Sequence, residues 1–169
     1  YDLEETNLLK AWQGNFANVA KMWMGRGASQ LMEPMNAAIE LSRGLSVAPK
    51  GKTWPQSAPE GYKNKGYDIQ DDGLPIFKFV IDDVQFTDLS EPADNSEGVV
   101  RTISSSKGNS YMTRIAQAKN IQALSQEGLY NIDGQYYIEV LNAGDVEVLN
   151  GETLVADFAE GEVKYRVIW

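Results

Sequence analysis

The sequence contains no cysteine and no histidine. Without cysteine the chain can form no disulfide framework, zinc–thiolate site or covalent haem attachment of the C-x-x-C-H type. Without histidine it has neither a Ser-His-Asp triad nor an imidazole metal ligand. Any catalysis would therefore rest on carboxylates, Lys, Tyr or Ser, and any metal would be a hard cation bound by oxygen atoms.

Positive charge is also scarce, because 15 Lys and Arg residues stand against 24 Asp and Glu residues, for a net charge of -9. Such a surface repels phosphate backbones, which predicts that nucleic acid is not a partner. No stretch approaches the roughly 20 apolar residues of a membrane helix, so we expect no transmembrane segment. The chain begins with Tyr1 instead of Met, and we expect it to be a segment of a longer chain without its targeting signal.

Length and apolar content predict one folded domain over residues 1–169, since 43% of the residues are hydrophobic. From Leu74 onward the pattern is typical of β-strands. Phe77, Phe79 and Ile81 alternate with other residues at period two, and the pair Asp82-Asp83 then marks a tight hairpin turn. The expected strands are Pro75–Ile81, Val84–Leu89, Val99–Ser105, Ser110–Ala116, Gln135–Leu141, Val146–Leu149, Thr153–Phe158 and Val163–Trp169. Short strands at this spacing predict an all-β, antiparallel β-sandwich with little helix.

The first part of the chain is ambiguous. In residues 1–47, apolar residues recur at three- and four-residue spacing, which favours an amphipathic helix, but Gly14, Gly25 and Gly27 oppose it. A strand through Leu8 to Trp12 followed by a loop is equally economical. Residues 48–74 are rich in Pro and Gly and nearly free of aliphatic side chains, so we expect a long surface connection there.

Two sets of acidic residues are candidates for chemistry. Asp68, Asp71 and Asp72, followed by Gly73, resemble part of a calcium loop, but the spacing is not that of an EF-hand and we favour a solvated acidic turn. We therefore expect no cofactor within this chain, with calcium at these three residues as the alternative. The second set would supply the paired carboxylates of a glycoside hydrolase on a β-sandwich. Its members are Asp88, Glu139, Glu147, Asp157 and Glu162.

Aromatic residues are candidates for sugar binding, because the apolar face of a sugar packs on a flat ring. We select Trp12, Trp23 and Trp54, with Arg26 as the polar partner of Trp23 in a glycine-flanked loop. A buried role in the core is the alternative for each Trp. For Trp54 we favour a plug at the edge of the sheet over stacking on a ligand.

Several stretches together resemble the β-rich accessory domain of large secreted bacterial proteins that also contain c-type cytochrome or sugar-dehydrogenase-like propeller modules. The stretches are Tyr1-Asp2-Leu3, Asn7–Phe16, Met22–Gly27, Gly73–Phe79, Val84–Asp88, Val100–Ile103 and Val163–Trp169. The family often has His at the position of Met24. The resemblance implies strand and loop for residues 1–47, and we adopt β over helix there.

The resemblance also implies a function and a location. We expect a non-catalytic, extracytoplasmic module, periplasmic or at the cell surface, that binds carbohydrate or protein within a larger exported assembly. Haem, if present, would belong to other modules, and the partners would be neighbouring domains or subunits and a glycan. The alternative is a carboxylate-dependent, sugar-active enzyme of the glycoside hydrolase type on the same sandwich.

Overall fold

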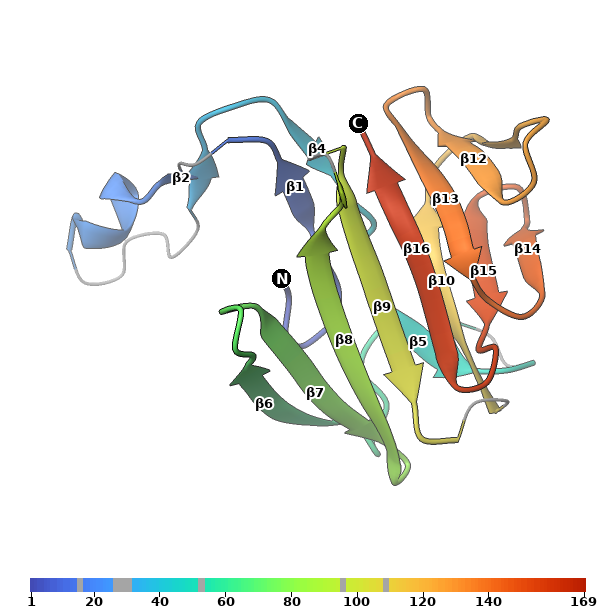
Figure 1. The fold of residues 1–169 in the computed structure, drawn as a ribbon. Coiled ribbons are helices and arrows are strands. Elements are labelled where there is room, and N and C mark those ends of the chain that lie inside the picture. Colours follow the sequence, from blue (N-terminus) through green and yellow to red (C-terminus); the bar gives the residue numbers. More distant parts are fainter. Residues whose placement is uncertain (15–16, 26–31, 52–53, 95–96, 108–109) are drawn as a thin grey trace.

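The computed structural model describes residues 1–14, 17–25, 32–51, 54–94, 97–107 and 110–169 (Figure 1). Nearly all regular structure in these residues is antiparallel β-sheet, which confirms the predicted fold class. The one helix there is the short 3₁₀ helix η1 (Ala20–Trp23). No described helix could therefore span a membrane.

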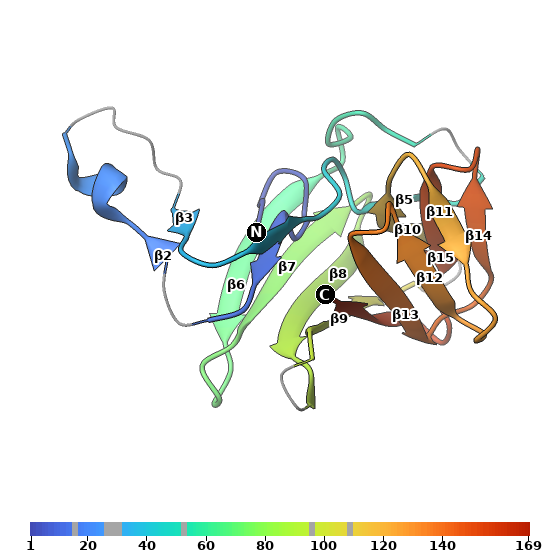
Figure 2. The same cartoon turned by 90° about the horizontal axis from the view of Figure 1, so that it is seen from above.

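The larger sheet has eight strands in the order β11-β12-β13-β16-β9-β8-β7-β6. Their bounds are β6 (Lys63–Ile69), β7 (Pro75–Ile81), β8 (Val84–Pro92), β9 (Val99–Ser105), β11 (Ile121–Ala123), β12 (Leu129–Ile132), β13 (Tyr136–Asn142) and β16 (Glu162–Ile168). The smaller sheet has the order β14-β15-β10-β5. Its strands are β5 (Val47–Pro49), β10 (Tyr111–Gln117), β14 (Val146–Leu149) and β15 (Thr153–Asp157). The two sheets face each other across the core, so the fold is a sandwich (Figure 2).

Two short ribbons precede the sandwich. The first pairs β1 (Lys10–Trp12) with β4 (Ala38–Glu40), and the second pairs β2 (Ala17–Asn18) with β3 (Glu33–Pro34). In both views β2, η1 and β3 project from the sandwich as an arm (Figures 1 and 2). The β assignment for residues 1–47 thus holds in the described residues.

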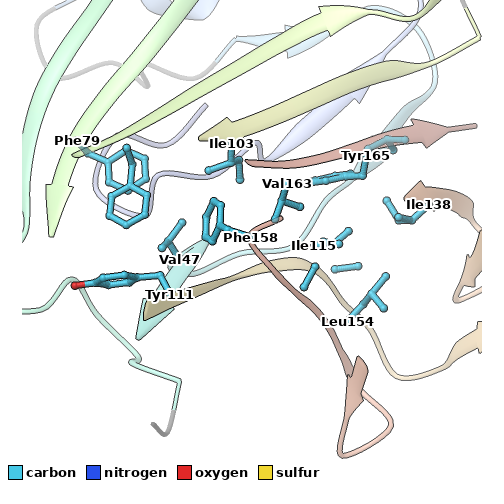
Figure 3. Close-up of a cluster of buried hydrophobic side chains, with 14 of the residues drawn as sticks. Val47, Phe79, Ile103, Tyr111, Ile115, Ile138, Leu154, Phe158, Val163 and Tyr165 are labelled. Atoms are coloured by element: carbon cyan, nitrogen blue, oxygen red, sulfur yellow. The ribbon is translucent and has the colours of Figure 1, made fainter. Parts of the chain in front are cut away.

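The core forms because strand alternation places apolar side chains on facing surfaces of the two sheets (Figure 3). In β16 the buried residues Val163, Tyr165 and Val167 alternate with partly exposed charged residues. Phe86 lies at the centre of the aromatic part. Its ring is stacked on Phe79 with centroids 5.0 Å apart and contacts the edge of Tyr111 at 5.1 Å.

The predicted turns have the geometry that two-residue hairpin turns require. Asp82 and Asp83 have φ values of 47° and 66°, and Ile81 pairs directly with Val84 across them. The Asp133-Gly134 and Asn150-Gly151 pairs likewise have positive φ at both positions. Asn, Asp and Gly tolerate this left-handed conformation better than other residues, so these dipeptides predict hairpin turns from the sequence.

The predicted surface connection over residues 48–74 is wrong in part, because Lys63–Ile69 forms the edge strand β6. This strand is exposed along nearly its whole length, so its sequence has no apolar alternation to reveal it. A bulge between Asn64 and Tyr67 contains Gly66 at φ 76°. Lysines and a bulge are common at sheet edges, where they discourage pairing with another chain. The short strands β5, β11 and β12 were also not predicted.

Candidate functional site

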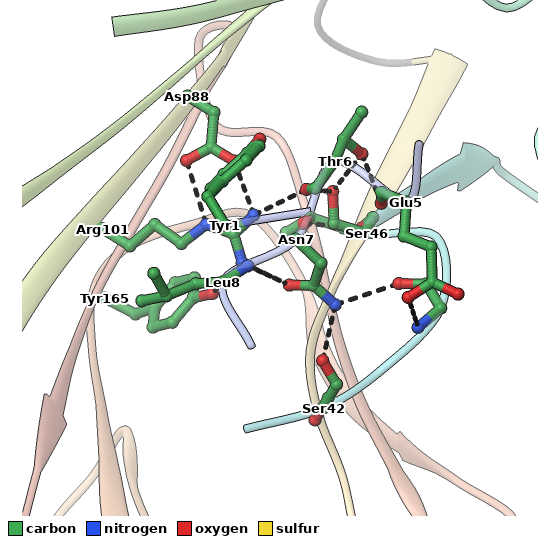
Figure 4. A network of polar contacts seen from close by, with 12 residues as sticks. Tyr1, Glu5, Thr6, Asn7, Leu8, Ser42, Ser46, Asp88, Arg101 and Tyr165 are labelled. Carbon is green, nitrogen blue, oxygen red and sulfur yellow. Dashed lines mark hydrogen bonds and ion pairs between the residues drawn. The ribbon is translucent and has the colours of Figure 1, made fainter. Parts of the chain in front are cut away.

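A buried polar network holds residues 1–7 against the sandwich (Figure 4). At its centre Arg101, 2% exposed, forms an ion pair with Asp88, which is fully buried. Nε of Arg101 donates to Oδ1 of Asp88 at 3.0 Å, and Nη2 donates to Oδ2 at 2.5 Å. Nη1 donates to Oδ1 of Asn7 at 2.8 Å and to the hydroxyl of Tyr165 at 3.0 Å, while Nη2 also donates to the Thr6 carbonyl at 2.9 Å. All five N–H donors of the guanidinium are therefore used, which indicates a structural role.

The charges of this network are stabilised by one another. Burial would lower the pKa of Arg101, but Asp88, Tyr165 and Tyr1 outweigh it and place that pKa well above the usual value for arginine. Tyr1 stacks on Phe77 with ring centroids 3.9 Å apart and donates its hydroxyl to Asp88 at 2.7 Å. Burial, reinforced by Asp88, raises the pKa of Tyr1 far above that of a free tyrosine. The network thus keeps the tyrosine neutral and the ion pair charged.

We predict a loss of stability at high pH from three buried tyrosines. Burial raises the pKa of Tyr1 and Tyr165, and raises that of Tyr136 to about 12. Since unfolded tyrosine titrates near pH 10, the folded state binds these protons more tightly. Their contribution is complete below about pH 10 and declines as the pH rises above it, and for Tyr136 the decline ends near pH 12. Urea unfolding at about pH 9, 10 and 11 measures this loss.

The control for this prediction is Tyr136→Phe, which removes one of the three titrating groups. Each group accounts for a slope of up to about 1.4 kcal/mol per pH unit. The variant should therefore lose stability less steeply than the unaltered protein above about pH 10. Equal slopes for the two proteins would contradict the buried, protonated state of Tyr136.

A second arginine, Arg114 on β10, has a different environment. It is 7% exposed, and its side chain contacts Gln117 and the main-chain carbonyl of Arg43, which lie outside the apolar core. There its Cζ lies 5.3 Å from the ring centroid of Trp54, a cation–π distance. Nε1 of Trp54 donates to the Leu45 carbonyl at 2.9 Å, which fixes the indole.

Trp54 and Arg114 lie beside a groove of about 630 Å³. It is lined by Arg43, Gly44, Trp54, Pro55, Gln56, Arg114, Gln117, Leu149, Asn150 and Thr153. These residues come from the chain around β5, from the end of β10 and from the β14–β15 turn. Gly44 has φ +82°, and a Cβ at this position would lie 2.5 Å from Nη2 of Arg114, so glycine allows the guanidinium to approach the loop. The groove offers a fixed ring, two cationic side chains and three amides.

The other predicted sugar-binding residues do not join this groove. Trp12 lies in a separate groove of about 310 Å³ between β1 and the ends of β8 and β9, together with Leu8, Pro92 and Val99. Trp23 lies on the arm and is 83% exposed. Arg26, its predicted partner, is outside the described residues. Trp54 is therefore the predicted aromatic residue that lines a polar groove, and its role as a plug at the sheet edge stays a prediction.

The predicted calcium residues lie around the β6–β7 turn. Asp68 on β6 pairs with Lys78, and Oδ1 of Asp72 accepts the Leu74 backbone N–H at 3.0 Å. Among the described residues, no group of three or more carboxylates is arranged to bind a metal ion. Asp71 is exposed in the same turn. These side chains act in turn geometry and surface pairing, and calcium binding stays a prediction.

Four of the five carboxylates considered for hydrolysis have partners of their own. Asp88 is bound to Arg101, and Glu139 pairs with Arg166 at 3.1 Å. Asp157 pairs with Lys50, and Glu162 accepts a hydrogen bond from Asn142 at 3.1 Å. Glu147 is exposed on β14. None of the five lines the Trp54–Arg114 groove.

No protein-family model and no curated protein matches this chain. The resemblance to the accessory domains of cytochrome-containing and sugar-dehydrogenase-like proteins thus stays a prediction. The Trp54–Arg114 groove, which we name the indole groove, is the feature with the chemistry of a binding site. Trp54 is predicted from the sequence as a binding residue, whereas Arg114, Arg43 and Gln117 are not.

Proposed function

We propose that this domain is a non-catalytic, extracytoplasmic module that binds carbohydrate in the indole groove. The observation that carries the proposal is the pairing of Trp54 with Arg114 at the side of a groove of about 630 Å³. Ligand sites combine an apolar surface with a few fixed polar groups, and this groove has both. Its volume is in the range of small-molecule sites.

The arrangement is suited to sugars for two reasons. First, the indole is held by Leu45 and Arg114, so a ligand that packs on it meets a ring whose position is already fixed. Second, the side-chain amides of Gln56, Gln117 and Asn150 line the groove, and an amide can both donate to and accept from a sugar hydroxyl. The partnered carboxylates described above favour binding over hydrolysis.

The arm supports the assignment to a larger exported assembly. Within the described residues, the arm and the chain that continues it towards β4 carry five apolar side chains that are more than 40% exposed. They are Val19 43%, Trp23 83%, Met24 79%, Met32 53% and Met35 67%. Exposed apolar side chains gathered in one region are typical of surfaces that contact another protein. The resemblance described for the sequence supports a neighbouring module of the same assembly as that protein.

Glycan-array screening of the domain, followed by calorimetric titration of the best ligand, tests the proposal. We expect Trp54→Ala to weaken glycan binding about tenfold or more, because truncation of a central aromatic residue commonly costs over 1 kcal/mol. Trp23→Ala is the matched control, since this Trp lies outside the groove, and it should leave the affinity unchanged.

Thermal unfolding of Trp54→Ala shows whether the variant is folded before its affinity is interpreted. A glycan array without any ligand would contradict the proposal. So would a glycan whose affinity is insensitive to Trp54→Ala in the folded variant, because the indole groove would then not be its site.

A further inference from the structure

We propose that the indole groove selects acidic glycans, with Arg114 and Arg43 binding a carboxylate or sulfate group on the sugar. The inference rests on the proposed carbohydrate-binding function and adds the class of ligand. An indole and three amides could bind a neutral sugar as well as an acidic one. A neutral sugar, however, has no negative charge that could pair with the two arginines.

The charge of the lining residues is the first observation. The groove is lined by two arginines and by no Asp or Glu, in a chain whose net charge is -9. A local excess of positive charge on an acidic protein creates a positive potential that attracts anions. Arg43 is exposed, and its main-chain carbonyl accepts the hydrogen bond of Arg114 Nη2 at 2.6 Å. The Arg43 main chain therefore lies against the Arg114 guanidinium, and both residues line the groove.

The second observation is the unused hydrogen-bonding capacity of Arg114. Its side chain makes two hydrogen bonds in the described structure, to the Arg43 carbonyl and, at 3.1 Å, to Oε1 of Gln117. Its Nε is buried and has no partner there. Arg101, with similar burial, uses all five donors and has a carboxylate partner. Arg114 is thus a nearly buried cation without an ion pair among the described residues, a costly state that an anionic ligand would relieve.

Glu5 is the acidic residue whose charge acts on Arg114, and its carboxylate already binds another group. Burial lowers the pKa of Arg114, and Glu5 opposes this effect, so the guanidinium stays charged at neutral pH. The carboxylate of Glu5 accepts the Gly44 backbone N–H at 2.7 Å and forms no ion pair with Arg114 in the described structure. A planar guanidinium matches the oxygen atoms of carboxylate and sulfate groups alike, and Nη1 and Nη2 each carry a hydrogen that the two bonds of the described structure do not use.

The test compares three oligosaccharides by calorimetry: an oligogalacturonate, the same oligomer with its carboxylates methyl-esterified, and a sulfated galactan of equal length. We expect the oligogalacturonate to bind at least about tenfold more tightly than its neutral ester at low salt. The difference should shrink when the salt is raised from about 50 to about 500 mM, since the charge on exposed Arg43 is screened. The sulfated galactan distinguishes sulfate from carboxylate as the anion.

Arg43→Gln is the variant of choice, because Arg43 is exposed and its loss should not affect folding. It should weaken binding of the acidic oligomer several-fold and leave binding of the ester unchanged. Lys65→Gln on exposed β6 changes the net charge equally but lies outside the groove, and should change neither affinity. This inference is overturned if the protein binds the acidic oligomer and its ester with equal affinity. It is also overturned if Arg43→Gln binds the acidic oligomer as tightly as the unaltered protein does. Neither result contradicts the binding of neutral sugars. Failure of all three oligomers and of every array glycan overturns the proposed function itself.

Discussion

Arg101→Met is expected to destabilise the domain by about 3–5 kcal/mol, because it leaves a buried carboxylate without its counter-charge. Asp88 is fully buried and accepts two of its three hydrogen bonds from Arg101, the third coming from Tyr1. Methionine fills much of the volume of the arginine stem, so the loss is chiefly electrostatic. A domain of this size is typically stable by only about 5–15 kcal/mol, so the fraction unfolded should rise visibly in urea titrations.

Two further variants separate charge from packing. Arg101→Met combined with Asp88→Asn removes both charges and retains the shape of the acidic side chain, and it should be more stable than Arg101→Met alone. Arg101→Lys keeps the positive charge while losing the bonds to Asn7 and Thr6, and should be intermediate. A loss of less than about 1 kcal/mol for Arg101→Met would contradict the conclusion that Arg101 and Asp88 form a desolvated ion pair.

Phe86→Ala is expected to cost a similar amount, about 3–5 kcal/mol, for a different reason. The Phe86 side chain is 1% exposed and lies between Phe79, Tyr111 and Phe158, with ring centroids 5.0, 5.1 and 6.1 Å away. These residues belong to both sheets or to the chain that follows β15, so the surrounding structure cannot collapse onto the cavity without separating the two layers. Chemical unfolding measures the loss.

Leu141→Ala is the matched control for the core variant. Leu141 is a large apolar residue on β13 but is 41% exposed, so its truncation leaves no enclosed cavity. We expect it to cost less than about 1 kcal/mol. Comparable losses for Phe86→Ala and Leu141→Ala would show that side-chain removal, and not cavity formation, sets the energy.

The sandwich was predictable because its central strands alternate and its turns contain residues that accept positive φ. Val163, Tyr165 and Val167 show this on β16, and Asp82-Asp83 shows it between β7 and β8. Strand β6 was not predictable in the same way, because an exposed edge strand buries no face and leaves no period-two signal. For residues 1–47, spacing alone also favoured a helix, and strand was preferred through the resemblance.

The candidate site was less predictable than the fold, for a physical reason. Trp54 and Arg114 are 60 positions apart, and no local sequence pattern around either residue indicates that the two are in contact. The Asp88–Arg101 pair did leave a signal, since Asp88 follows Val84 and Phe86 at period two and so had to face the core. A charge at such a position needs a buried partner, but the identity of that partner follows only from the register of β8 against β9.

The position of β16 in the larger sheet has a consequence for folding during synthesis. Residues 162–168 lie between β9 and β13, in the interior of the eight-stranded order. Until this segment has left the ribosome, β9 and β13 each have an unpaired edge, and the inward face of β16 is missing from the core. Exposed edges of this kind promote pairing between nascent chains. The domain is therefore expected to remain incomplete, and dependent on protection from aggregation, until β16 has been made.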